Sequence, residues 1–385
     1  MSTLLRWGVV ALATVHGLIH LMASAVRFGW IEDADLSPGG DGVLWALAAV
    51  LLLVTALLAA AATTIWWVVA LTAVVVSQVV IVLSWTETST GTLANVALLL
   101  AAGYALVHEG PGSFHAQWVR GTKATLASER NAPPLVTQDD LDGLPEPLAA
   151  YIRKSGAIGR PRPERIYLEF HGRIRADRHG RWMPFAGRQV STFGSNPQRW
   201  FILDATRGGL PVTVLHHYGN ATASMRGKLL SLLTVLDASG PEMDRGETVT
   251  VFNDLVVLAP GAIPGAPVRW TQIDDDRVRG VFTLGPHSVS AELVFDAHHQ
   301  LVDFLSHDRP RASADGTSFT EQKWSTPSPR PRMRDGRPGL SGSARWCDDD
   351  GWFTYVEIDF DLIVDNPSTV EPASRAAAVR ERQDA

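Results

Sequence analysis

The sequence predicts an α-helical membrane bundle of four spans, followed by a β-rich α+β domain with a curved antiparallel sheet or half-barrel and two or three helices. Charge is the first observation behind this prediction. Residues 1–110 hold only eight charged side chains, although such residues make up 19% of the 385-residue chain. The second observation is a change of period, because beyond residue 160 apolar and polar residues alternate as they do in strands. A wholly soluble enzyme and a fibrous repeat are thereby excluded.

Net charge and cysteine content exclude further classes. The formal net charge of −6 argues against nucleic acid as a partner, because binding to phosphates needs a basic surface. Cys347 is the single cysteine, which excludes an intrachain disulfide and a metal cluster built on cysteines.

The first 108 residues contain four apolar runs, each of about the 20 residues that a membrane helix needs. We place the spans at about 4–24, 43–62, 65–85 and 90–108, and interpret 1–108 as a four-helix transmembrane domain. Residues 42–86 carry no charge and are long enough for two crossings. We interpret the first run as a retained span rather than a cleaved signal peptide, because three more spans follow it.

The few charges around the spans predict an orientation. The loop between the first two spans carries four acids, Glu32, Asp33, Asp35 and Asp41. Basic residues lie at the start of the first span and follow the fourth: Arg6, Arg120, Lys123 and Arg130. The positive-inside rule then places both chain ends, and with them the β-rich domain, in the cytoplasm of a multi-pass membrane protein.

Four polar residues inside the predicted spans are candidates for a site: His16, His20, Gln78 and Asn95. At a rise of about 1.5 Å per residue, all four lie about 18–24 Å from the inner ends of their helices. Polar groups at one depth face the bundle interior and hydrogen-bond to each other. We interpret these residues as hydrogen-bonding contacts between helices. One alternative is a site for a ligand, haem, quinone or metal at His16 and His20. Another is that their common depth is accidental.

Residues 109–135 read as a linker with Gly and Pro pairs, and 136–366 as the β-rich domain. A short helix is expected at 144–155, where the prolines fall in the first turn. Alternation then predicts strands near 166–175, 190–193, 200–205 and 212–218. Residues 225–237 fit either a strand or a helix, and 247–259 read as a helix that ends at Pro260.

A meander of strands is expected over 268–307, with turns at 274–276, 285–286 and 296–299. Residues 317–325 form another expected strand, 326–340 a loop rich in Pro and Arg, and 354–364 the last strand. About nine or ten strands result. Residues 367–385 read as a mobile tail.

The motif search favours a protein without enzymatic activity, and it identifies no catalytic residue and no metal site. The chain has no phosphate-binding loop, dinucleotide fingerprint, zinc-protease motif or nucleophile elbow. His216 and His217 are neighbours on a strand and therefore point to opposite faces, so the pair cannot chelate one metal. Asn253 and Asp254 lie in an otherwise apolar helix, which predicts either a bond to the neighbouring sheet or a polar spot in a cavity.

Two resemblances follow from particular segments. Residues 270–274, 278–283 and 289–296, with Phe252, Asn253, Asp254 and Pro260 upstream, resemble an uncharacterised bacterial family classed only as a domain of unknown function. The four-span layout and the segment from His16 to His20 resemble small DoxX-like membrane proteins. The β-rich domain is also similar to the lipoprotein-carrier (LolA-like) half-barrel at the level of fold. These resemblances imply no catalytic residue.

The function that we predict is a membrane-anchored β-rich domain that holds a lipid or another apolar small molecule in a hydrophobic concavity. Its partners would be the lipid bilayer and that ligand, without a resident cofactor. Two alternatives remain: a membrane oxidoreductase that uses His16 and His20, and a structural or regulatory partner without a ligand.

Overall fold

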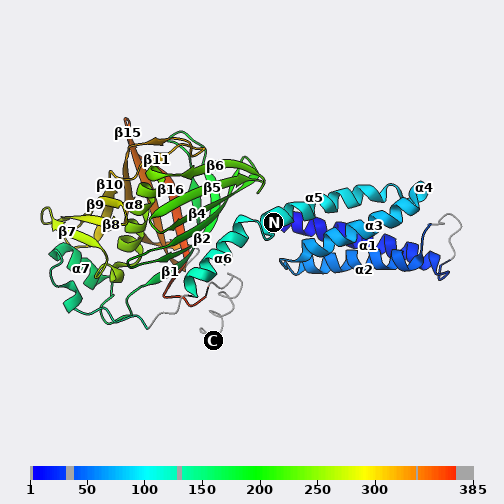
Figure 1. The fold of residues 1–385 in the computed structure, drawn as a ribbon, viewed down its shortest axis with the longest axis horizontal. Coiled ribbons are helices and arrows are strands. Elements are labelled where there is room, and N and C mark those ends of the chain that lie inside the picture. Colours follow the sequence, from blue (N-terminus) through cyan, green and yellow to red (C-terminus); the bar gives the residue numbers. More distant parts are fainter. Residues whose placement is uncertain (1–2, 32–38, 128–131, 335–336, 370–385) are drawn as a thin grey trace. The chain divides into compact units, whose positions relative to one another are not determined.

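The computed structural model describes residues 3–31, 39–127, 132–334 and 337–369, and the chain forms two compact units, Met1–Ala116 and Gln117–Ala385 (Figure 1). The predicted mobile tail lies outside the described residues from 370 onward, as do three of the four loop acids used for orientation, Glu32, Asp33 and Asp35.

The first unit is a helical bundle. Four of its helices are long and apolar enough to cross a membrane. Its elements are α1 (Thr3–Arg27), α2 (Gly42–Ala60), α3 (Trp66–Leu83), the short α4 (Trp85–Thr88) and α5 (Gly91–Glu109). Small side chains fill the interior where these helices pack, among them Ala13, Ala56, Ala59, Ala70, Ala73, Ala102 and Ala105. Large apolar side chains face outward, among them Val15, Leu57, Val75, Leu93 and Leu100.

The second unit contains one large sheet of 14 strands, and every strand pair in it is antiparallel. Its strand order is β6-β5-β4-β3-β2-β1-β16-β15-β13-β10-β9-β8-β7, and β14 pairs with β15 beside this path. The strands are β1 (Arg165–Ile174), β2 (Met183–Thr192), β3 (Arg199–Arg207), β4 (Leu210–Gly219), β5 (Thr222–Leu229), β6 (Leu233–Ser239), β7 (Val268–Gln272), β8 (Arg277–Leu284), β9 (His287–Phe295), β10 (Leu301–Ser306), β13 (Lys323–Pro327), β14 (Arg330–Arg334), β15 (Arg337–Asp348) and β16 (Gly351–Asp365). β11 (Arg311–Ala312) and β12 (Phe319–Thr320) form a separate small pair.

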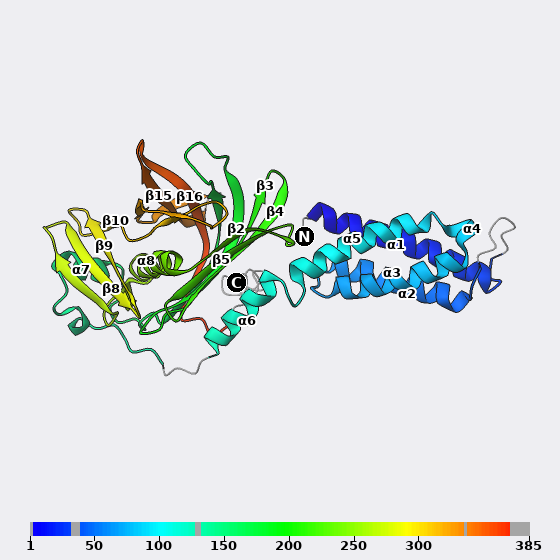
Figure 2. The ribbon, with the colours of Figure 1, turned by 45° about the horizontal axis from the view of Figure 1, so that its top comes forward.

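The sheet curves around one helix, α8 (Pro241–Leu258), which lies inside its concave side (Figure 2). The helix begins with Pro241 directly after Gly240, whose φ of 98° only glycine adopts easily. Most of its residues are buried, because the sheet encloses it. The described helices also include α6 (Phe114–Leu126), α7 (Glu146–Lys154) and two short 3₁₀ turns, Asp139–Leu141 and Pro260–Ala262. α7 packs into the same core as α8 through Leu148 and Ile152.

The fold class is as predicted, but several local details differ from the expectations. Residues 326–340 contain β14 and the start of β15 instead of a loop, and the strands outnumber the nine or ten expected. The segment 225–237, which we left open, spans the β5–β6 hairpin. The predicted linker contains α6, which is held to β3 by a bond of 2.7 Å from Thr125 Oγ1 to Gln198 Oε1 just before that strand. α8 begins six residues earlier than the helix expected at 247, because the Gly240–Pro241 start signal was overlooked.

Candidate functional site

A cavity of about 1100 Å³ lies between the concave face of the sheet and α8. Alternate residues of β3 and β4 point into it, and the period of two explains why these residues and not their neighbours do so. Most of the lining is apolar, as Leu168, Phe170, Phe201, Leu203, Val214 and Trp346 illustrate. This volume lies at the upper end of the range for pockets that hold small molecules.

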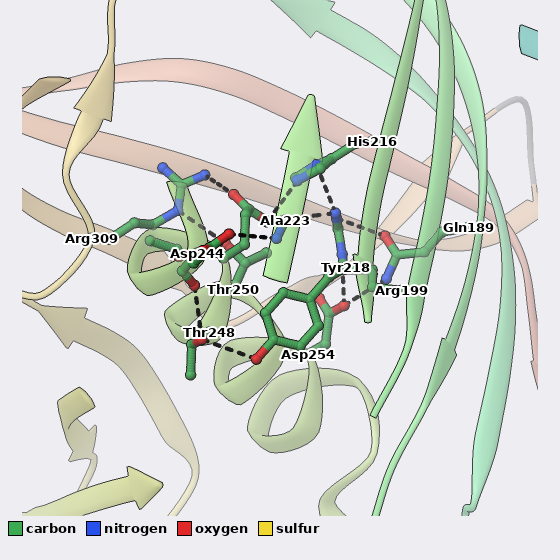
Figure 3. Close-up of polar contacts among 12 residues, drawn as sticks. Gln189, Arg199, His216, Tyr218, Ala223, Asp244, Thr248, Thr250, Asp254 and Arg309 are labelled. Carbon is green, nitrogen blue, oxygen red and sulfur yellow. Dashed lines mark hydrogen bonds and ion pairs between the residues drawn. The ribbon is translucent and has the colours of Figure 1, made fainter. Parts of the chain in front are cut away.

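A charged cluster interrupts this apolar lining where α8 meets β2, β3 and β4 (Figure 3). We call it the α8–sheet cluster; it consists of Gln189, Arg199, His216, Glu247, Asp254 and Arg309. Glu247 and Asp254 lie seven residues apart on α8, and therefore on one face of the helix. Gln189, Arg199 and His216 come from three neighbouring strands, while Arg309 follows β10.

Arg199 is the centre of the α8–sheet cluster, and its side chain is only 9% exposed. Its Nε donates to Asp254 Oδ2 at 3.0 Å, and its Nη2 donates to Gln189 Oε1 at 3.0 Å. Asp254 Oδ2 also accepts from Gln189 Nε2 at 2.7 Å and from Ser191 Oγ at 3.1 Å. Because every one of these groups is buried, removing one partner alone would leave the others without a hydrogen bond and would destabilise the fold.

The contacts of Arg199 also determine which nitrogen of His216 carries the proton. Arg199 Nη1 lies 3.1 Å from His216 Nδ1, and a guanidinium has only donors, so Nδ1 must accept. Nε2 therefore carries a proton, and it lies 3.0 Å from Glu247 Oε2. The two atoms therefore pair with each other on the cavity wall, although their alignment is poor for a hydrogen bond.

The pKa values of Glu247 and Asp254 are shifted in opposite directions. Burial alone would raise the pKa of the Glu247 carboxyl, but His216 together with the charges of Arg309 and Arg199 holds it well below its ordinary value. Arg309 Nη2 reaches Glu247 Oε1 at 3.1 Å, and its guanidinium lies over Trp324. Burial raises the pKa of Asp254, and Arg199 only opposes this shift.

The residues Asn253 and Asp254, which the sequence singled out, both line the cavity and both bond to the surrounding strands. Asp254 contacts β2 and β3 as described, and the amide nitrogen of Asn253 donates to Thr326 Oγ1 in β13. The sequence analysis did not identify the other members of the α8–sheet cluster. One sequence signal could have found Glu247, because Glu247, Thr250 and Asp254 form a polar stripe at helical spacing in an apolar segment. No sequence signal connects Arg199 or Arg309 to that stripe.

His216 and His217 point to opposite faces of β4, as expected for neighbours on a strand. His216 faces the cavity, whereas the ring of His217 lies 3.8 Å from that of Trp200, centroid to centroid. Burial, followed by the neighbouring His216 and Arg226, lowers the pKa of His217 to about 4. His217 is therefore neutral at physiological pH and packs as an aromatic ring.

The four candidate residues of the helical bundle form one hydrogen-bonded network with Ser77. His16 Nε2 lies 3.1 Å from Asn95 Oδ1 and 3.2 Å from Ser77 Oγ, and Asn95 Nδ2 donates to Gln78 Oε1 at 3.0 Å. His20 Nε2 lies 2.9 Å from Ser77 Oγ. These contacts link α1, α3 and α5. A haem, quinone or metal at His16 and His20 stays an untested alternative.

Comparisons with known proteins identify a family and two distant folds. The model of a family of unknown function, DUF6544, matches residues 134–358. No curated protein matches the chain. A domain named for outer membrane lipoprotein sorting, from Vibrio parahaemolyticus, is 11% identical, with 56% of this chain and 90% of that chain covered and a TM-score of 0.29. A DUF1329 family protein from Desulfovibrio piger is 12% identical, with 57% and 92% covered and a TM-score of 0.30. Similarity this distant carries no argument about a ligand.

Proposed function

The chain belongs to the DUF6544 family of unknown function, and we propose that it is a membrane-anchored protein whose β-rich unit binds a lipid or another apolar ligand in the cavity beside α8. The cavity carries this proposal. A space of about 1100 Å³ with a mainly apolar wall exposes hydrophobic surface that an apolar ligand would remove from water.

The α8–sheet cluster supports an amphipathic ligand rather than a pure hydrocarbon. His216 and Glu247, which pair with each other at 3.0 Å, and Arg199, Asp254 and Arg309 give one part of the cavity wall a polar and charged character. A polar group of the ligand, such as a hydroxyl, would find hydrogen-bonding partners on this part of the wall and apolar contacts elsewhere.

The composition of the bundle supports the anchor. Large apolar side chains face outward and small ones lie between the helices, which is the arrangement of helices packed in lipid. The internal hydrogen bonds of His16 and Asn95 satisfy polar groups that lipid could not.

Filling the cavity should remove the ligand. Val214 is half-buried and lines the cavity, so tryptophan in its place would occupy the space that the apolar chain needs. We expect native mass spectrometry of the full chain in detergent to show a co-purified amphiphile in the wild type and little of it in Val214→Trp. Val302→Trp is the matched control, because Val302 is exposed on β10 and does not line the cavity. Equal lipid content in all three proteins would refute the cavity as the binding site.

The β-rich unit should lie on the cytoplasmic side of the membrane. Basic residues near the ends of the bundle, Arg6 in the first turn of α1 and Arg120 and Lys123 in α6, favour this side. A reporter that is active only in the cytosol, fused after Asn366, should be active, and a reporter that needs export should not. The opposite pair of results would reverse the orientation but leave the four spans in place.

A further inference from the structure

The ends of two neighbouring hairpins form an apolar tip on the second unit. The β3–β4 hairpin turns at Gly208–Gly209 and the β5–β6 hairpin turns at Leu230–Ser231. A hydrogen bond of 2.8 Å from Leu230 N to Pro211 O joins them. Leucines crowd this end: Leu210 is 46% exposed, Leu232 60% and Leu233 61%. We call Leu210, Leu230, Leu232 and Leu233 the leucine tip.

The turn of the second hairpin holds a leucine in an unfavourable backbone conformation. Leu230 and Ser231 have φ values of 55° and 58°, the left-handed region that tight hairpins require and that Asn and Gly fill at least cost. The first hairpin uses Gly208 and Gly209 for the same conformation. Leu230, half-buried and held at positive φ, is backbone strain of the kind that functional sites keep.

The leucine tip lies next to the open end of the cavity. The exposed residues Thr206 and Arg207 line the cavity at the end of β3, and Val235 and Leu236 line it two to three residues beyond Leu233. At the same end of the sheet, the exposed Arg181 in the β1–β2 connection lines it as well. Neither Arg181 nor Arg207 makes an ion pair with another described residue. Exposed leucines beside unpaired arginines match an anionic lipid surface, with acyl chains for the former and headgroups for the latter.

We propose that the leucine tip inserts into the headgroup region of an anionic bilayer and so places the mouth of the cavity at the membrane surface. The proposal rests on the membrane anchoring of the proposed function, which keeps the unit near lipid, but not on the identity of the cavity ligand. Arg207 and Arg181 add an electrostatic attraction that salt weakens, whereas the leucine contribution persists at high salt.

The single cysteine makes this docking measurable in the full chain. In a Cys347→Ser background, Ser231→Cys carries an environment-sensitive fluorophore at the leucine tip, and Asp275→Cys carries it at the exposed β7–β8 turn as a matched control. The protein is reconstituted in nanodiscs of phosphatidylglycerol with phosphatidylcholine, and in nanodiscs of phosphatidylcholine alone. We expect emission from position 231 to shift to the blue and its quenching by iodide to fall several-fold in the anionic nanodiscs, with no change at position 275.

Two substitutions then assign the effect to the leucines. Leu232→Ser with Leu233→Ser should restore iodide quenching at position 231, while lipid content by native mass spectrometry stays at the wild-type level. This second measurement separates failure of docking from failure of the cavity proposal. The docking proposal is overturned if the label at position 231 stays accessible to iodide in anionic nanodiscs, or if positions 231 and 275 change alike. It is also overturned if the shift already occurs in detergent and grows with protein concentration, since a second copy of the chain would then cover the tip.

Discussion

Arg199→Met should lower the free energy of unfolding of the β-rich unit by about 3–5 kcal/mol, the effect of breaking a buried ion pair from one side. Methionine fills much of the same space but cannot donate to Asp254, Gln189 or His216. Asp254 would keep two neutral donors and lose its cationic partner in a buried setting. Urea unfolding of the full chain in detergent, followed by tryptophan fluorescence, measures the change.

A double substitution and an exposed ion pair are the controls for this result. Arg199→Met combined with Asp254→Leu removes both charges, so it should be more stable than Arg199→Met alone. Arg153→Met removes a surface salt bridge of 2.9 Å to Glu146 and should change the free energy of unfolding little. If Arg199→Met behaved like Arg153→Met, the α8–sheet cluster would not hold the helix to the sheet.

Glu247→Gln should destabilise the β-rich unit by about 1.5–3 kcal/mol near neutral pH, the usual contribution of hydrogen bonds to a charged group. The pKa of Glu247 is held below its ordinary value of 4.5 in the folded state, so its carboxylate stabilises the fold above that pH. This contribution is lost as the pH falls from 4.5 towards the lowered value. The difference in stability between variant and wild type should therefore shrink in acid.

Asp254 does not obscure this comparison. Its pKa is raised, so its own contribution changes with pH in the opposite sense, but it is present in both proteins. Unfolding midpoints of the two proteins over a series of acidic buffers give the result. A difference that stayed constant below pH 4.5 would show that the charge of Glu247 contributes nothing to stability.

Structural features that depend on a sequence pattern within one helix or strand could be predicted. The apolar runs predicted the four long helices, and alternation along strands such as β9 and β16 predicted the antiparallel sheet. The resemblance of the β-rich domain to a family of unknown function is confirmed by the match over residues 134–358. The DoxX-like resemblance of residues 4–108 stays a prediction, because that match does not include them. Local signals that were overlooked, such as Gly240–Pro241 before α8, explain the error at that boundary.

The sequence by itself determined the period of each segment and the polar positions Asn253 and Asp254 within α8, because these depend on residues a few positions apart. Only the tertiary structure decided which strands meet α8. Arg199 lies 55 residues from Asp254, and Arg309 lies 62 residues from Glu247, and no local pattern encodes such pairings. The curvature of the sheet, which leaves a cavity between the strands and α8, likewise results from many strand pairs together. Periodicity therefore predicted the classes of element, and the long-range pairing of the strands made the site.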